Sequence, residues 1–179
     1  MSDNKGESKV DKAVECLNSV GSADEDQCKT GNMAEFNNRV DRAVECHAME
    51  NGFNCSQSIF MTYSEDFGID REAALKLSCG LGGGMGRTGH VCGAVTGAVL
   101  ILGLKYGRYK LEDKESKERT YSLVQEFEKQ FIERNGTVVC DELLKINMRT
   151  ADKDFIKALT KKECHRYIRD AAEILEGFL

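Results

Sequence analysis

From residue 36 onward, apolar residues recur every three or four positions, which is the period of an α-helix that packs on one face. The first such stripe consists of Cys55, Ile59, Tyr63 and Phe67. Asn54 precedes this stripe as a favourable N-cap, and Gly68 follows it as a favourable helix end. A short helix is predicted next over 71–79, entered through Asp70. We therefore expect helices to follow one another closely in this region.

The second half of the chain keeps the helical period. An apolar helix is predicted over about 91–106, where Gly93, Ala94, Gly97 and Ala98 leave a flat side for another backbone. The amphipathic helix over 113–134 has a stripe of Tyr121, Val124, Phe127 and Phe131. The C-terminal stripe consists of Cys164, Ile168, Ala171, Leu175 and Phe178. Residues 137–139 are too short for a strand and have no partner run, so we predict an all-α compact helical domain with a glycine-rich interhelical loop.

The first 35 residues differ from the rest, because they are polar and charged and hold few large apolar side chains. Residues 1–35 are predicted to form a flexible N-terminal arm, and 36–179 a cysteine-containing helical domain. The segment 10–16 recurs at 40–46, each time with a cysteine in last place. The simpler interpretation is a partly duplicated amphipathic helix. The alternative is that Cys16 and Cys28 supply extra thiols.

The composition and net charge of the chain limit the classes of partner that it is expected to bind. The 179 residues are 41% hydrophobic, which suffices for one core, and the net charge is −5 with a pI near 5.4. This charge predicts no nucleic-acid partner and no contact with an anionic membrane. The first thirty residues lack an apolar signal-peptide core, and the longest apolar run, over 91–104, is shorter than the ~20 residues of a spanning helix. A cytoplasmic location is expected.

Eight cysteines in a cytoplasmic chain favour metal binding, redox chemistry or buried packing over structural disulfides. The run 82–97 leads from a glycine-rich loop to Cys92 at the start of the apolar helix. The free N–H groups and partial positive charge of a helix N-terminus stabilise a thiolate there. Arg87 and His90 lie close enough in sequence to add to this effect. Cys92 is therefore the candidate catalytic nucleophile.

Several ordered motifs resemble one family. They are Gly52-Phe53-Asn54-Cys55-Ser56-Gln57, Gly80-Leu81-Gly82-Gly83-Gly84-Met85-Gly86-Arg87, Cys92-Gly93-Ala94-Val95-Thr96-Gly97-Ala98, Leu104-Lys105-Tyr106-Gly107, Cys140-Asp141-Glu142-Leu143-Leu144 and a late Cys164. Over roughly 38–178 the chain is similar to the putative redox-active proteins named for a C, GCAxxG, C, C cysteine pattern. The resemblance implies redox or metal chemistry, and it maps the four family cysteines onto Cys55, Cys92, Cys140 and Cys164.

The positions of these four cysteines allow all of them to face one interior. Thiolates gathered in a dry core are costly unless a cation neutralises them or they pair as disulfides. Four thiolates suit either zinc or an iron–sulfur cluster. The sequence contains no C-x-x-C motif, so the spacing of its cysteines does not decide between the two. We predict a redox-active protein that binds a cluster or other metal for electron transfer or redox sensing. Its redox partner protein is not specified by the sequence, and a homodimer is compatible with it.

Two alternatives stay open. One is a thiol–disulfide oxidoreductase in which Cys92 attacks and another family cysteine resolves the mixed disulfide. The other is a structural helical module whose cysteines pack as small hydrophobic residues.

The loop glycines form a candidate cofactor-binding group of Gly82, Gly83, Gly84 and Gly86. Residues 84–89 match G-x-G-x-x-G, but no strand leads into them, so a dinucleotide fold is not expected. We expect the loop to let its backbone approach a cluster or a neighbouring helix, with N–H groups free for sulfur or an anion.

The remaining cysteines and histidines receive weaker assignments. Surface positions are expected for His47 and His165, and His90 has either a thiolate-tuning role or a plain helix-entry role. Cysteines without a predicted role are Cys16, Cys28, Cys46 and Cys79.

Overall fold

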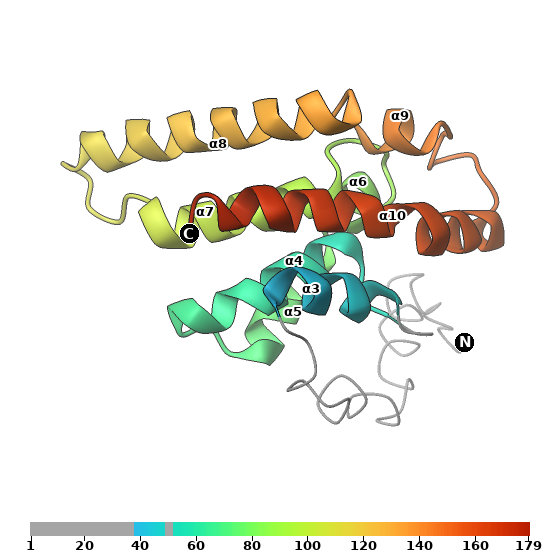
Figure 1. Cartoon of the computed structure of the whole chain (residues 1–179), viewed down its shortest axis with the longest axis horizontal. Coiled ribbons are helices and arrows are strands. Elements are labelled where there is room, and N and C mark those ends of the chain that lie inside the picture. The colour runs from blue at the N-terminus through green and yellow to red at the C-terminus, as the bar shows by residue number, and fades with distance from the viewer. Residues whose placement is uncertain (1–37, 49–51) are drawn as a thin grey trace, which may run out of the picture. The chain divides into compact units, whose positions relative to one another are not determined.

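The computed structural model describes residues 38–48 and 52–179. Its elements, shown in Figure 1, are α3 (Arg39–Ala48), α4 (Cys55–Ser64), the 3₁₀ helix η1 (Glu65–Phe67), α5 (Arg71–Cys79), α6 (Gly82–Met85), α7 (Gly93–Tyr106), α8 (Lys114–Asn135), α9 (Cys140–Leu144) and α10 (Lys153–Glu176). These residues contain no strand beyond one isolated bridge between Val91 and Val139. The predicted all-α fold is confirmed. The predicted arm over 1–35 lies outside the described residues.

Capping side chains define the starts of several helices. Asn54 Oδ1 accepts hydrogen bonds from the N–H groups of Ser56 and Gln57, and the Asn54 N–H donates to Gln57 Oε1 at 3.1 Å. This reciprocal capping box fixes the first turn of α4, which begins with Cys55. Asp70 caps α5 by accepting a hydrogen bond from the Ala73 N–H. These starts agree with the sequence prediction.

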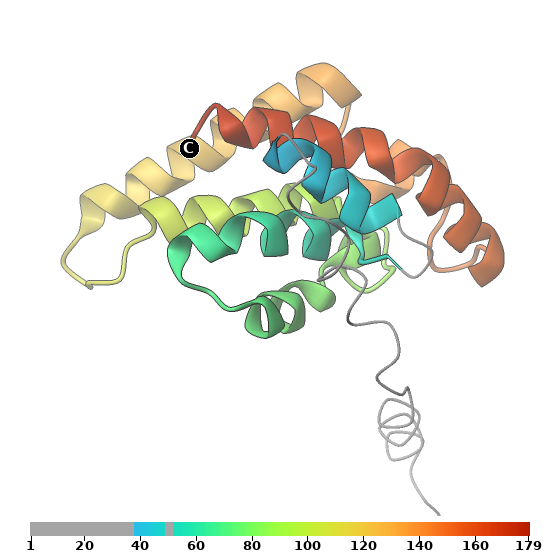
Figure 2. The ribbon, with the colours of Figure 1, turned by 60° about the horizontal axis from the view of Figure 1, so that its bottom comes forward.

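Helices α4 and α7 form the centre of the domain and lie side by side (Figure 2). Their backbones approach closely at two glycines of α7. A Cβ atom on Gly97 would lie 2.9 Å from the Ser56 carbonyl oxygen, and one on Gly93 would lie 3.1 Å from the Cys55 Cβ. The small residues predicted to form a flat side therefore do so against α4. As a result, the N-terminal ends of both helices, and with them Cys55 and Cys92, lie together.

The long helices α8 and α10 complete the core. Helix α10 packs against α3, α7 and α8, and it buries Cys164, Tyr167, Ile168, Ala171, Ala172, Ile174 and Leu175. Helix α8 buries Phe127 and Phe131. Its predicted stripe is wrong at Tyr121, which is 54% exposed and carries the Lys117 ammonium over its ring at 5.2 Å. None of the helices in the described ranges is long and apolar enough to cross a membrane.

The close approach at Gly97 predicts a position-specific effect of a single methyl group. Gly97→Ala forces the Ser56 backbone and Ile59 to move, and we expect the free energy of unfolding to fall by about 1–3 kcal/mol. Gly103→Ala on the same helix is the control, because a Cβ there meets nothing within 4 Å. The control should gain about 0.5–1 kcal/mol from helix propensity. Equilibrium denaturant unfolding measures both variants, and equal effects would contradict the packing described here.

Candidate metal and redox centre

Four cysteines from different elements line a single cavity of about 510 Å³. Cys55 is the first residue of α4, Cys92 is the N-cap of α7, Cys140 is the first residue of α9 and Cys164 lies midway along α10. Each is at most 7% exposed. The four cysteines implied by the family resemblance thus share one enclosed space, although they are far apart in sequence.

Backbone hydrogen bonds place Cys92 beside Cys140. The Cys92 N–H donates to the Val138 carbonyl at 2.8 Å, and the Cys140 N–H donates to the His90 carbonyl at 2.6 Å. These bonds flank the bridge between Val91 and Val139. The segment 137–139, which is too short for a strand, therefore still ties the start of α9 to the start of α7.

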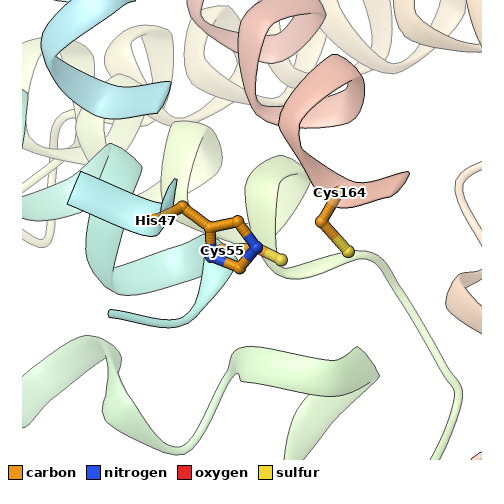
Figure 3. A group of neighbouring side chains, drawn as sticks. All are labelled: His47, Cys55 and Cys164. Atoms are coloured by element: carbon orange, nitrogen blue, oxygen red, sulfur yellow. The ribbon is translucent and has the colours of Figure 1, made fainter. Parts of the chain in front are cut away.

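The tightest group in the cavity consists of His47, Cys55 and Cys164 (Figure 3). One ring nitrogen of His47 and the two sulfur atoms all lie within 4.8 Å of one another. These side chains come from the end of α3, the start of α4 and the middle of α10. A nitrogen and two sulfurs at this spacing form a donor set that suits zinc or another soft transition metal.

His47 is held by backbone carbonyl groups on two sides. Its Nδ1 lies 2.7 Å from the Phe53 oxygen, and its Nε2 lies 3.3 Å from the Thr160 oxygen. A neutral imidazole carries only one N–H, and the shorter contact favours Nδ1 as the donor. Nε2 is then left with a lone pair, as in metal-bound histidines whose other nitrogen donates to a carbonyl.

The predicted surface positions of the two helical histidines are wrong. His47 is half-buried and lines the cavity, while His165 packs edge-on against it with ring centroids 5.3 Å apart. Burial is the main cause that lowers the pKa of His165, and the electrostatic effect of His47 adds to it. The reason is that α3 lies against α10, which brings the C-terminal end of α3, with His47, beside the middle of α10, with His165.

The predicted helix N-terminal stabilisation of the Cys92 thiolate is present, but burial outweighs it. Burial, and to a smaller extent the nearby charge of Cys55, raises the pKa of Cys92 to about 12. The N–H groups of Ala94 and Val95 act in the opposite direction. Burial similarly raises the pKa of Cys140, with smaller contributions from the charges of Cys92 and Cys55. Desolvation in the cavity therefore exceeds the helix N-terminal effect.

The Cys55 thiol is coupled directly to Cys164. A hydrogen bond with the Cys164 side chain, followed by burial and the negative charge of Cys164, raises the pKa of Cys55 well above its ordinary value. Such a pair shares a proton more readily than it carries two negative charges. A cation or a disulfide bond would remove this repulsion.

The glycine-rich loop contains α6 and turns in the left-handed sense. Residues 83–87 all have φ between 63° and 67°, including the two non-glycine residues Met85 and Arg87. Gly82, Gly83 and Gly86 line the cavity, whereas Gly84 is buried where a Cβ would lie 2.8 Å from that of Cys140. The Gly86 N–H donates to the Gly82 carbonyl inside the loop at 2.9 Å. Cofactor binding by these glycines stays a prediction.

The other sequence candidates lie around this centre. Cys79 is exposed and lines the cavity, while Cys46 is buried in α3. The exposed His90 ring has its Nε2 3.4 Å from the Arg149 guanidinium, and the His90 carbonyl holds Cys140. This contact agrees with a helix-entry role. Cys16 and Cys28 lie outside the described residues.

Comparison with known proteins agrees with the arrangement of cysteines. The model of the family described as "Putative redox-active protein (C_GCAxxG_C_C)" matches residues 53–178. The chain belongs to this family. An uncharacterized protein of Archaeoglobus fulgidus is 24% identical over 129 residues, which cover 68% of this chain and 81% of that protein. No solved structure matches the chain. His47 lies outside the matched range, because it precedes residue 53.

The raised pKa of Cys92 predicts how the stability of the reduced, metal-free protein depends on pH. Above pH 9 the unfolded chain loses the thiol proton while the folded protein keeps it, so stability falls as pH rises toward 12. One such group contributes a slope of up to about 1.4 kcal/mol per pH unit. Denaturant unfolding between pH 8 and 11 should therefore show a shallower loss for Cys92→Ala than for the starting protein. Cys79→Ala, at an exposed thiol, is the control and should leave the slope unchanged; identical slopes in all three proteins would refute the assignment.

Proposed function

We propose that this protein is a redox-active metal–thiolate protein in which His47, Cys55 and Cys164 hold a metal ion. The observation that carries the proposal is the mutual spacing of their ligand atoms, all within 4.8 Å. Two sulfur atoms bound to one zinc-like ion at ~2.3 Å each are at most ~4.6 Å apart. A small inward movement of the three side chains would therefore let all three bind one ion, with a fourth coordination position left for another ligand.

The electrostatics of the cavity support a cation at this position. Cys55, Cys92 and Cys140 all have raised thiol pKa values, since burial and mutual repulsion oppose their ionisation. A bound metal ion reverses that preference, because thiols that coordinate a metal lose their protons. The protein would thus carry its protons when empty and release them on metal binding.

Cys92 and Cys140 would act as further ligands of the centre. Both thiols line the same cavity and are available to complete the coordination of the ion. With Cys55 and Cys164 they also form the four-thiolate set that would hold an iron–sulfur cluster. Such a cluster would supply one-electron transfer, and the role that follows is electron transfer or redox sensing with a partner protein.

Anaerobic purification followed by metal analysis and a visible spectrum tests this proposal. We expect about one metal ion per chain. In Cys55→Ser, Cys164→Ser and His47→Ala, we expect the affinity for this ion to fall at least tenfold. Cys79→Ser should keep the metal, because that thiol is exposed and lies outside the three-ligand group. Folded, colourless and metal-free protein would refute the proposal.

The same variants separate one ion from a cluster. If the centre is a single metal ion bound by His47, the His47→Ala variant loses the metal and the protein contains no acid-labile sulfide. An iron–sulfur cluster held by the four cysteines instead gives iron and sulfide in equal amounts and visible absorption, and the His47→Ala variant keeps it.

A second candidate function rests on the proximity of Cys55 and Cys164, whose sulfur atoms lie within 4.8 Å of each other. These two thiols are placed to form a disulfide, in which each loses one proton and one electron to a small oxidant such as hydrogen peroxide, which is reduced to water. Mild oxidation of the metal-free protein should then give a reversible loss of two hydrogens, located by peptide mapping to Cys55 and Cys164. Unchanged thiols would exclude this function, and a disulfide at Cys92 would point instead to the sequence-based alternative.

A further inference from the structure

The cavity is much larger than a metal ion requires. Its volume of about 510 Å³ falls inside the ~300–1,000 Å³ range of sites that bind small organic molecules. It also reaches solvent, because Cys79, Arg87 and Lys157 line it and are exposed. The space beyond the thiols therefore remains accessible from outside.

The charges around this opening are of one sign. Arg87 and Lys157 line the cavity, and no aspartate or glutamate of the described residues does so. Neither cation forms an ion pair with a carboxylate within the described ranges. In a chain with a net charge of −5, two unpaired cations on one cavity favour an anionic ligand.

Arg87 is fixed at this edge by an unusual backbone conformation. It ends the left-handed run over 83–87 with φ of 63°, and its N–H donates to the Gly82 carbonyl at 3.4 Å. Such a conformation costs a residue other than glycine on the order of 1 kcal/mol, and it persists because the loop enforces it. The loop thus positions a guanidinium group whose fork suits a carboxylate or a phosphate.

Part of the cavity lining is apolar. It consists of Leu143, Leu144, Met148 and Ile156, all of them buried. We propose that this cavity binds a small amphipathic organic anion whose carboxylate or phosphate pairs with Arg87 and Lys157. Its hydrocarbon part lies along the apolar part of the lining, and its far end faces the thiols. This assignment concerns the cavity alone and does not depend on metal binding at His47, Cys55 and Cys164.

Calorimetric titration of the full chain with matched probes tests the proposal. Hexanoate and hexyl phosphate carry both features, and their relative affinities identify the preferred acid group. Hexanol lacks the charge and acetate lacks the hydrocarbon part. At least one of the two amphipathic anions should bind about tenfold or more tightly than hexanol and acetate. Equal affinity of all four probes, or no detectable binding, would overturn the proposal.

Variants then locate the binding site. Arg87→Gln and Lys157→Gln should each weaken binding of the preferred anion about tenfold. Lys153→Gln is the matched control, because Lys153 is exposed on the same helix one turn away and does not line the cavity. Equal affinities in all three variants would overturn the assignment to this cavity. Thermal melting checks that each variant is folded, and metal content measured on the same samples separates this result from the fate of the proposed metal centre.

Discussion

The close contact between the backbones of α4 and α7 determines the rest of the site. It is possible only because Gly93 and Gly97 present no side chain to Cys55, Ser56 and Ile59. The contact aligns the N-terminal ends of the two helices, so that the first residue of α4 and the N-cap of α7 are both cysteines on one cavity. Once these two thiols are fixed, α9 and α10 need to supply only one cysteine each.

The gathering of these thiols has an energetic consequence. A buried thiol is tolerated as a small hydrophobic group, but its anion is costly in the same place. Burial and mutual repulsion therefore raise the pKa values of Cys55, Cys92 and Cys140 and favour their protonated forms. Under the proposed function, a bound cation or an oxidant would relieve this repulsion.

Local signals in the sequence were sufficient for the helices that have caps and long apolar stripes. Asn54, Asp70 and Gly68 mark starts and ends that depend on neighbouring residues only. The short helix α9 has no side-chain cap, and its first N–H groups donate to the carbonyls of Gly89 and His90, so its local sequence could not indicate it. The exposure of Tyr121 likewise depends on where α8 lies in the fold, which periodicity does not show.

The site was only partly predictable for the same reason. Family resemblance located four cysteines, but the place of His47 beside them depends on how α3 lies against α10. A sequence signal did exist, since His47 ends a helix that the repeat predicts and precedes Cys55 closely. The helix N-terminal effect on Cys92 was predictable because a helix N-terminus is visible in sequence, whereas the desolvation that outweighs it depends on how other elements enclose the thiol.

X-ray absorption at the metal edge tests the central claim most directly, because it reports the atoms around the metal without a crystal. In protein purified anaerobically, the account predicts two or more sulfur neighbours at ~2.3 Å and a nitrogen neighbour at ~2.0–2.1 Å for a zinc-like ion. In His47→Ala, loaded with excess metal to offset its weaker affinity, the nitrogen contribution should vanish. A shell of oxygen atoms only, or a spectrum that His47→Ala and Cys55→Ser leave unchanged, would contradict the account.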